Sequence, residues 1–487
     1  MPDAPGPRTG VDAGSAFQAD AAPVAVVGGG LAGLAAAYRL HGAGVDIRLF
    51  EASHQVGGVV ASHRQDGFLA ESGPHSLGRP APRIQALLSQ VGLDASVVTP
   101  DPHRAHRFIV RNGILHPLPT SIPDLLTTQL LGKRSLLRIL GEPFRWGKSS
   151  TPDGDESVAD LLRRRGLGEE LVQTFLDPFV AGVYAGDPER LSVRHAFPLL
   201  HGLVEEHGSL VQGLALRGLR GWQARRRPEG TPEPRPPAVL SFREGMEEIP
   251  RALARPLAGR IRTGTPIRGI RTGTHAPGWE LLGEGDHSLG TFRQVVLALP
   301  AHALAHLSLP GALGSAAASL REIRHPPVTL VTLGFPQAQG QHPLDGFGML
   351  IPRVEGRRIL GALFPSTLFP ERAPPGHLTV AVFIGGTRQP DLALQAPHEL
   401  EALARDELSQ LLGIRQEPVF RHHRVWQNAI PQFEVGYGRF QKTAHHLETL
   451  CPGVVLAGSW RGGVSVGDAL GSGLDAADRL LRAEGAA

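Results

Sequence analysis

The stretch Val24-Ala25-Val26-Val27-Gly28-Gly29-Gly30-Leu31-Ala32-Gly33 decides the fold of this chain. Its four leading apolar residues predict a short buried strand, and the Ala- and Leu-rich segment from Leu31 to about Leu40 predicts a helix. Gly28, Gly30 and Gly33 then fall on the turn, where they permit a tight bend, close approach of a pyrophosphate, and packing of helix on strand. The free N–H groups at the helix start would hold the phosphates. The stretch therefore predicts a dinucleotide site.

Two downstream signals narrow the choice of dinucleotide. Glu51 lies 18 residues beyond Gly33, at the end of a second expected strand over Asp46–Phe50. A carboxylate in that position can accept hydrogen bonds from both ribose hydroxyls of an adenosine. The doublet Gly57-Gly58 is typical of flavoproteins, whose longer cofactor runs across a second loop. Together these features favour FAD over NAD.

Composition sets broad limits on the kind of protein. A chain of 487 residues with 41% apolar and 20% charged residues predicts a globular protein of two or three domains. A net charge of +3 gives no indication of nucleic-acid binding. The single cysteine, Cys451, cannot form an intrachain disulfide, which favours a cytoplasmic location. Residues 1–22 lack the apolar core of a signal peptide, and no apolar run of about 18 residues predicts a membrane-spanning helix.

The order of predicted elements indicates a discontinuous nucleotide domain. Later segments resemble its continuation: Ser241–Met246 with a helix and a strand near Ile261, a buried strand over Val295–Leu299, and Gly453–Gly458 before a helix around Gly473–Leu481. We expect an α/β fold, α+β overall, with a hinge at Arg225–Pro237. The expected parts are a tail (1–22), FAD-binding segments (23–88, 238–304 and 431–487), a helical insert (89–208), a helix and Pro/Arg-rich linker (209–237), and a substrate domain (305–430).

The insert is predicted to be largely helical over residues 101–208. Leucines recur there at near-helical spacing. The segment from His103 to Lys148 contains eight Lys or Arg residues and only two acidic residues. A basic, apolar helical layer can rest on an anionic bilayer without spanning it. The same leucines are equally compatible with an ordinary interdomain core. Both interpretations stay open at this point.

Several segments resemble the FAD-dependent, oxygen-dependent protoporphyrinogen oxidases of the flavin amine oxidase superfamily. The match runs from about Pro23 to Leu481. Besides the glycine stretch and Glu51, it rests on Glu71–Ser76, His106–Ile109 with His116–Pro119, Ala181–Asp187, Ser241–Met246, Gly346–Pro352, Leu368–Pro374, Ile430–Gln432 and Gly463–Asp468. The resemblance implies a Rossmann-like FAD domain of the p-hydroxybenzoate-hydroxylase type. It also implies a substrate domain beside the helical insert, for which both the membrane and the core interpretation stay open.

Residues for a non-covalent FAD follow from the glycine pattern and from this resemblance. They are Gly28, Gly29, Gly30, Leu31, Ala32, Gly33, Glu51, Ala52, Gly57, Gly58, Val59, Gly73, Pro74, His75, Ser76, Ile267, Ser459, Val464, Ser465 and Val466. The resemblance places Arg107 against a substrate propionate and Phe347, Gly348 and Leu350 against the macrocycle. This sequence has His75-Ser76 where some family members carry Arg-Gly. The shape of the site near the flavin therefore stays open at this point.

The resemblance implies a reaction in which protoporphyrinogen IX loses six electrons to O2 in three rounds through the flavin, giving peroxide. We name no catalytic side chain and no metal site, because FAD carries this chemistry. Coproporphyrinogen III is the alternative substrate, for which Arg104 or Arg111 are candidate contacts. A flavin amine oxidase is disfavoured by the absence of Lys between Lys148 and Lys442, and a phytoene-type desaturase or a non-catalytic porphyrin-binding flavoprotein is more distant.

The partners expected from this resemblance are the porphyrinogen and O2, with no nucleic acid. Attachment to the inner face of the cytoplasmic membrane, a homodimer, and hand-over of product to the next enzyme of the haem pathway are further expectations.

Overall fold

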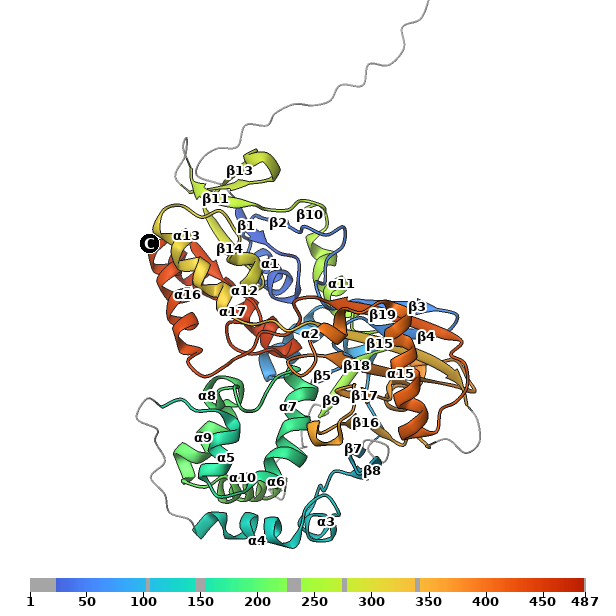
Figure 1. The fold of residues 1–487 in the computed structure, drawn as a ribbon. Coiled ribbons are helices and arrows are strands. Elements are labelled where there is room, and N and C mark those ends of the chain that lie inside the picture. Colours follow the sequence, from blue (N-terminus) through green and yellow to red (C-terminus); the bar gives the residue numbers. More distant parts are fainter. Residues whose placement is uncertain are drawn as a thin grey trace, which may run out of the picture.

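A parallel five-stranded sheet carries the glycine turn. The computed structural model describes residues 23–101, 106–144, 154–225, 238–273, 278–337 and 342–485, so the expected tail and residues 226–237 of the expected hinge lie outside the described residues. The strand order is β10-β2-β1-β14-β20, and the sheet lies in the upper half of Figure 1. Its strands are β1 (Val24–Val27), β2 (Ile47–Phe50), β10 (Ile261–Arg262), β14 (Gln294–Leu297) and β20 (Val454–Leu456). The predicted strand before the glycines is confirmed.

Helices cover this sheet, which explains why all four residues of β1 are buried. The final helix α17 begins seven residues earlier than the predicted start at Gly473, and it packs directly on α1. A Cβ at Gly473 would lie 2.0 Å from the Ala32 carbonyl oxygen, so only glycine permits this approach. The helices of this part are α1 (Leu31–Gly42), α2 (Pro82–Gln90), α11 (Glu248–Ala254), α12 (Ala301–Leu304), α13 (Ala312–Ala318), α16 (Gly438–Leu450) and α17 (Val466–Gly485).

A mixed seven-stranded sheet forms the second large unit, in the order β19-β15-β18-β17-β16-β7-β8. Helix α15 (Pro397–Leu412) packs on it, and α14 (Pro365–Leu368) connects two of its strands. The strands are β7 (His106–Arg111), β8 (Ile114–Pro117), β15 (Val328–Pro336), β16 (Gly346–Leu350), β17 (Gly361–Leu363), β18 (His377–Gly385) and β19 (Phe420–Trp426).

The prediction that residues 101–208 are largely helical is wrong for 106–117. The run Phe108-Ile109-Val110 favours a strand, and β7 pairs in parallel with β16, more than 230 residues away. Pairing with this distant strand determines the conformation of residues 106–117, and their own hydrophobic pattern gives no sign of that partner.

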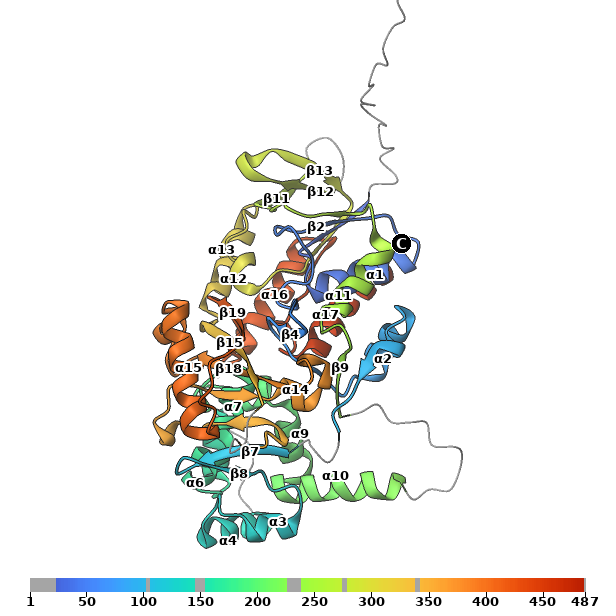
Figure 2. The same ribbon diagram turned by 90° about the vertical axis from the view of Figure 1, so that its right-hand side faces the viewer.

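The described part of residues 118–208 is largely helical, and its helices lie beside and below the seven-stranded sheet in Figure 1 and Figure 2. Its leucines divide between the two interpretations: Leu130 and Leu131 are buried, whereas Leu126, Leu137 and Leu140 are about half exposed or more. Within the described residues, no helix is long and apolar enough to cross a membrane. The helices of the insert are α3 (Ile122–Thr127), α4 (Lys133–Gly141), α5 (Val158–Arg164), α6 (Glu169–Leu171), α7 (Asp177–Tyr184), α8 (Val193–Ala196) and α9 (Pro198–His207), and α10 (Leu210–Arg225) follows it.

Short strands connect these units. They are β3 (Ser62–Gln65) with β4 (Phe68–Glu71), β5 (Leu77–Gly78) and β6 (Val97–Val98) on either side of β9 (Val239–Phe242), and the antiparallel set β11 (Gly269–Thr272), β12 (Trp279–Leu282) and β13 (Ser288–Phe292).

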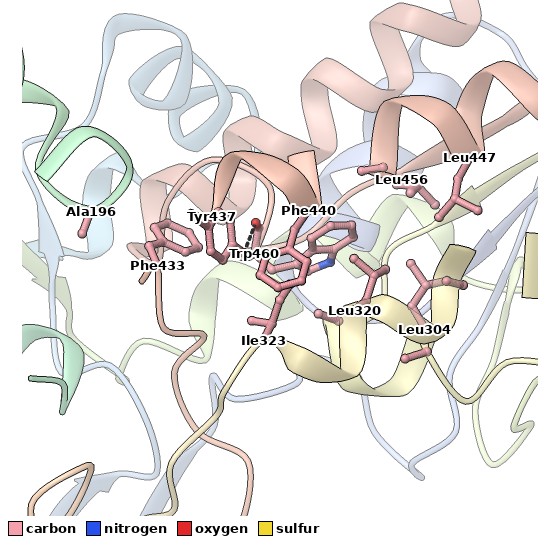
Figure 3. Packing of buried hydrophobic residues seen from close by; sticks show 14 of the residues in the cluster. Ala196, Leu304, Leu320, Ile323, Phe433, Tyr437, Phe440, Leu447, Leu456 and Trp460 are labelled. Atoms are coloured by element: carbon pink, nitrogen blue, oxygen red, sulfur yellow. Dashed lines mark hydrogen bonds between the residues drawn. The ribbon is translucent and has the colours of Figure 1, made fainter. Parts of the chain in front are cut away.

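An aromatic core joins α16 to the segment after β20 (Figure 3). The Tyr437 hydroxyl donates to the Trp460 carbonyl at 2.7 Å, and the Trp460 indole N–H donates to the Leu299 carbonyl at 3.0 Å. Both side chains are almost fully buried, so their polar atoms need these partners. The core therefore fixes residue 460, which directly follows the predicted flavin residue Ser459.

Two buried glutamate–arginine contacts hold separate parts of the chain. Glu71 lies 3.6 Å from Arg372 and accepts hydrogen bonds from the Ser62 hydroxyl at 2.6 Å and the Met246 N–H at 3.0 Å. Burial raises the pKa of Glu71 to about 7 despite these donors. This contact joins β4, the start of the second FAD segment, and the loop before β18.

The second contact, between Glu142 and Arg165, lies at the start of α10. Arg165 lies 2.7 Å from the Glu142 carboxylate, which also accepts from the Ser209 hydroxyl and from the Leu210 and Val211 N–H groups at the helix start. Burial alone would raise the pKa of Glu142, but the hydrogen bonds from Ser209 and Arg165 outweigh it and lower the pKa.

The two glutamates predict opposite pH responses. Glu71 contributes stability fully below its ordinary pKa of 4.5 and loses it as pH rises towards 7, whereas Glu142 contributes above its unfolded pKa and loses it as pH falls. Between about pH 3 and pH 7.5 the two variants should respond oppositely. From pH 4.5 to 7.5 the unaltered protein should lose stability relative to Glu71→Gln, by on the order of 3 kcal/mol, and from about pH 5 down to 3 it should lose stability relative to Glu142→Gln. Chemical denaturation across this range measures both. Parallel responses of the two variants would contradict the assignment.

Candidate functional site

The glycine turn is shaped by contacts that exclude side chains. Gly28 has φ +102°, and a Cβ there would lie 2.5 Å from the Ala298 carbonyl oxygen. A Cβ at Gly33 would lie 1.8 Å from the Gly28 carbonyl oxygen. At Gly30, in contrast, a Cβ would meet no protein atom within 4 Å. The turn therefore leaves open space at the start of α1, whose first N–H groups have no side-chain cap. This cradle fits a pyrophosphate.

Glu51 is held at the end of β2. One carboxylate oxygen accepts from the Gly29 N–H at 2.6 Å, and the other accepts from the Ser53 N–H at 2.8 Å and hydroxyl at 2.6 Å. The side chain is only partly buried, and Ala52 beside it is exposed. Thr265 donates from its backbone to the Glu51 carbonyl, which brings the loop carrying Ile267 alongside. The carboxylate is thus held at the end of β2 beside the glycine turn, as the predicted ribose contact requires.

The second glycine pair lies against the first turn. Gly57 forms a parallel bridge with Gly30 and donates to the Gly29 carbonyl at 2.8 Å. A Cβ at Gly58 would lie 3.3 Å from the Gly30 Cα. Val59 is half exposed, and its carbonyl lies so close to Gly73 that a Cβ at residue 73 would come within 2.1 Å. The predicted loops 57–59 and 73–76 are therefore adjacent.

The C-terminal segment closes the same region. Gly467 at the start of α17 lies against Leu77, the residue after Ser76. The Ser465 hydroxyl donates to Asp468 at 2.6 Å, and the Asp468 N–H donates back to that hydroxyl, which orders this helix start. Val464 packs on the same core as Ile267, and Ser459 precedes the buried Trp460. The structure thus brings residues from all three predicted FAD segments together.

His75 marks where the flavin loop meets the seven-stranded sheet. Its ring is buried and lies 5.9 Å from that of Phe383 in β18. Burial, with a smaller effect of Arg372, lowers the pKa of His75 to about 4, so the imidazole is neutral near pH 7. The departure from Arg-Gly therefore places no additional charge beside Pro74 and Ser76.

The predicted substrate residues lie on β7 and β16. The Arg107 guanidinium carbon lies 5.0 Å from the centre of the Phe347 ring, and Arg107 is exposed. Gly348 pairs with Arg107 and has φ +151°, and a Cβ there would lie 2.3 Å from the Ala362 carbonyl oxygen. Leu350 faces α7, where a Cβ at Gly182 would lie 2.4 Å from its methyl carbon. Arg107 thus places a positive charge above the apolar ring of Phe347.

Paired residues of the seven-stranded sheet link the predicted flavin loop to the predicted substrate residues. Leu350 pairs with Gly361, and Gly361 pairs with Phe383, which His75 contacts. Two strand spacings, about 10 Å, separate Leu350 from Phe383. The predicted substrate residues and the predicted flavin loop therefore meet on one sheet.

Sequence reasoning missed the buried residues that support this site. Asp177 at the start of α7 pairs with Arg388 after β18 at 2.8 Å, and Glu71 pairs with Arg372. The available signal for Glu71 was a charged residue ending an otherwise apolar strand at Phe68–Glu71.

Burial raises the pKa of the Cys451 thiol to about 11, which suits a packed side chain and gives no support for a covalent flavin link.

Comparisons with known proteins agree with this geometry. Residues 31–481 match the family described as flavin containing amine oxidoreductase. Protoporphyrinogen oxidase 2 of Arabidopsis thaliana is 33% identical over 478 residues, covering 94% of this chain and 93% of that protein. Human protoporphyrinogen oxidase is 32% identical, covering 95% of this chain and 98% of that protein.

Solved structures extend the comparison. A crystal structure from Exiguobacterium sp. 255-15, assigned provisionally to protoporphyrinogen oxidase, is 26% identical, with a TM-score of 0.78 over 94% of this chain and 98% of that one. Reduced UDP-galactopyranose mutase, 17% identical with a TM-score of 0.72 over 95% of this chain and 94% of that one, shares the fold. The predicted fold class is confirmed, and the chain belongs to the flavin containing amine oxidoreductase family.

Proposed function

We propose that this chain is an FAD-dependent oxidase that converts protoporphyrinogen IX to protoporphyrin IX in haem biosynthesis, with O2 as acceptor and peroxide as product. The observation that carries the proposal is full-length similarity, at 31–33% identity, to plant and human enzymes named protoporphyrinogen oxidase. The exposed Arg107 above the Phe347 ring, on the same sheet as the Phe383 that His75 contacts, supports it.

The flavin cradle in this proposal consists of the glycine turn and its neighbours. The open space at Gly30 receives the pyrophosphate, and Glu51 receives the ribose. The loop at Gly73–Ser76 and the start of α17 at Val464–Val466 hold the ring system. Bound FAD supplies the hydride acceptor, while the protein supplies position, a dry surface and charge.

The substrate contacts in this proposal come from β7 and β16. Phe347 and Leu350 pack on the macrocycle and exclude water from the reacting bridge. Arg107 has no ion-pair partner among the described residues, so its guanidinium can pair with a propionate. The neutral His75 leaves the apolar surface uncharged.

One contact bears on coproporphyrinogen as the alternative substrate. Arg111 lies 3.1 Å from Glu170 and also donates to the Leu130 carbonyl, so its guanidinium is already used within the insert. Arg104, the other candidate contact, lies outside the described residues. The engagement of Arg111 favours the substrate with two propionates over the one with four.

We also propose that the protein is cytoplasmic and attaches peripherally to the membrane through α4. Leu137 and Leu140 are 69% and 49% exposed, and Phe144 in the following turn is 84% exposed. Lys133 and Arg134 on the same helix are exposed as well. This combination of apolar and basic side chains suits an anionic lipid surface.

The substrate and the electron path can be tested together. Mixing the purified holoprotein with protoporphyrinogen IX without oxygen should bleach the flavin absorbance, and air should restore it while porphyrin fluorescence appears. Coproporphyrinogen III serves as the parallel sample. A flavin that stays oxidised with both porphyrinogens would refute the proposed function.

Gly30→Ala tests the pyrophosphate cradle. The new methyl group meets no protein atom, so folding should be preserved, but it occupies the open space and should weaken FAD binding at least tenfold, about 1.4 kcal/mol. Gly42→Ala, at the far end of α1 and equally unhindered, is the matched control. Titration of the apoprotein with FAD measures both. Equal affinities would remove Gly30 from the cradle.

Arg107→Ala tests the propionate contact. Losing a charged hydrogen bond of about 1.5–3 kcal/mol should raise KM roughly 10- to 150-fold, with a smaller effect on kcat. Arg405→Ala, which removes an arginine of α15 that pairs with Glu417, is the control. Steady-state porphyrin formation provides both constants, and an unchanged KM would exclude Arg107 as a substrate contact.

The membrane proposal predicts flotation with vesicles. The protein should float with phosphatidylglycerol vesicles at low salt, and Leu137→Asp/Leu140→Asp should abolish this. Val419→Asp changes an exposed apolar residue just before β19 and should float normally. Absence of flotation of the unaltered protein would contradict attachment through α4.

A further inference from the structure

A buried ion pair connects α7 to the end of the predicted substrate strand. Asp177 opens α7, and Arg388 lies just after β18. Their side chains are only 8% and 9% exposed, and an Arg388 nitrogen lies 2.8 Å from an Asp177 carboxylate oxygen. Figure 1 shows α7 beside the seven-stranded sheet, and residues of α7 contact its inner strand β16.

The two ends of the Arg388 guanidinium hold different segments. One nitrogen donates to Asp177, and the other donates to the Ile351 carbonyl at 2.7 Å. The same Asp177 oxygen accepts from the Arg353 N–H at 2.7 Å. Arg388 and Asp177 therefore fix the chain directly after β16 against the first turn of α7.

This attachment fixes the position of Leu350, a predicted substrate residue, relative to α7. Ile351 follows Leu350, whose methyl carbon would lie 2.4 Å from a Cβ at Gly182 on α7. The spacing between Leu350 and α7 is thus already minimal, and a shift of either element changes the surface that a macrocycle meets. Phe179 and Val183, on the same helix, are 46% and 43% exposed.

We propose that Arg388 is a positioning residue that sets the spacing of α7 from β16 and thereby the affinity for the porphyrinogen; this inference rests on the proposed function. A planar fork can hold a carbonyl and a carboxylate in fixed geometry, which a lysine ammonium cannot. A buried ion pair often adds little net stability, because desolvation offsets the attraction. Burial lowers the pKa of Arg388, in agreement with such a cost.

The test compares Arg388→Gln, Arg388→Lys and the double variant Asp177→Asn/Arg388→Gln. Arg358→Gln, which breaks an exposed pair with Asp406 near the same sheet, is the control. Each holoprotein is assayed for FAD content, KM and kcat with protoporphyrinogen IX. We expect KM to rise at least tenfold in the Arg388 variants, with FAD content unchanged and kcat within about threefold, and no change in the control.

Arg388→Lys separates fork geometry from charge. Because it keeps the positive charge beside Asp177 but cannot hold both partners as the fork does, its KM should rise nearly as far as that of Arg388→Gln. If Arg388→Gln leaves an unpaired carboxylate and fails to fold, Arg388→Lys and the double variant decide the question. Any Arg388 variant with full FAD content and a KM within twofold of the unaltered protein overturns the proposal. Lack of turnover in the unaltered holoprotein would instead refute the proposed function.

Discussion

The burial of Glu71 against Arg372 is the constraint on which the arrangement of this molecule depends. Glu71 stands directly before the loop Ser72–Ser76, and Arg372 donates to the Ser241 hydroxyl at 2.8 Å and to the Phe242 carbonyl at 2.9 Å. Neither side chain has water to replace a lost partner, since both are at most 2% exposed. Three segments far apart in sequence must therefore come together at once. The flavin loop takes its position from that meeting.

The need to keep Glu71 and Arg372 together also helps to bring the predicted flavin residues close to the predicted substrate residues. The parallel sheet carries the glycine turn, and the seven-stranded sheet carries Arg107 and Phe347. The loop Ser72–Ser76 contacts Phe383 of the seven-stranded sheet on one side and Val59 of the second glycine loop on the other. Catalysis by a bound flavin needs a short distance from the ring to the substrate and a surface without water. Here that proximity comes from the packing of two sheets, so residues remote from the ligands control it.

The sequence predicted the local parts of this site well and the distant contacts poorly. The strand Val24–Val27 and the glycine turn follow from composition and short-range geometry, because Gly28 and Gly33 permit approaches that no other residue permits. The β7–β8 hairpin was missed because its main partner, β16, lies more than 230 residues away. The pairs Asp177–Arg388 and Glu71–Arg372 were missed for the same reason: a lone charge in sequence does not reveal its partner.

The position of α17 has a consequence for how the protein matures. This helix, residues Val466–Gly485, packs on α1 near the very start of the described chain, and its first turn completes the flavin cradle beside Leu77. The proposed cradle is therefore complete only after α1 and α17, whose first residues Leu31 and Val466 lie far apart in the sequence, have packed together. A nascent chain that has not yet reached α17 lacks one wall of the proposed cradle.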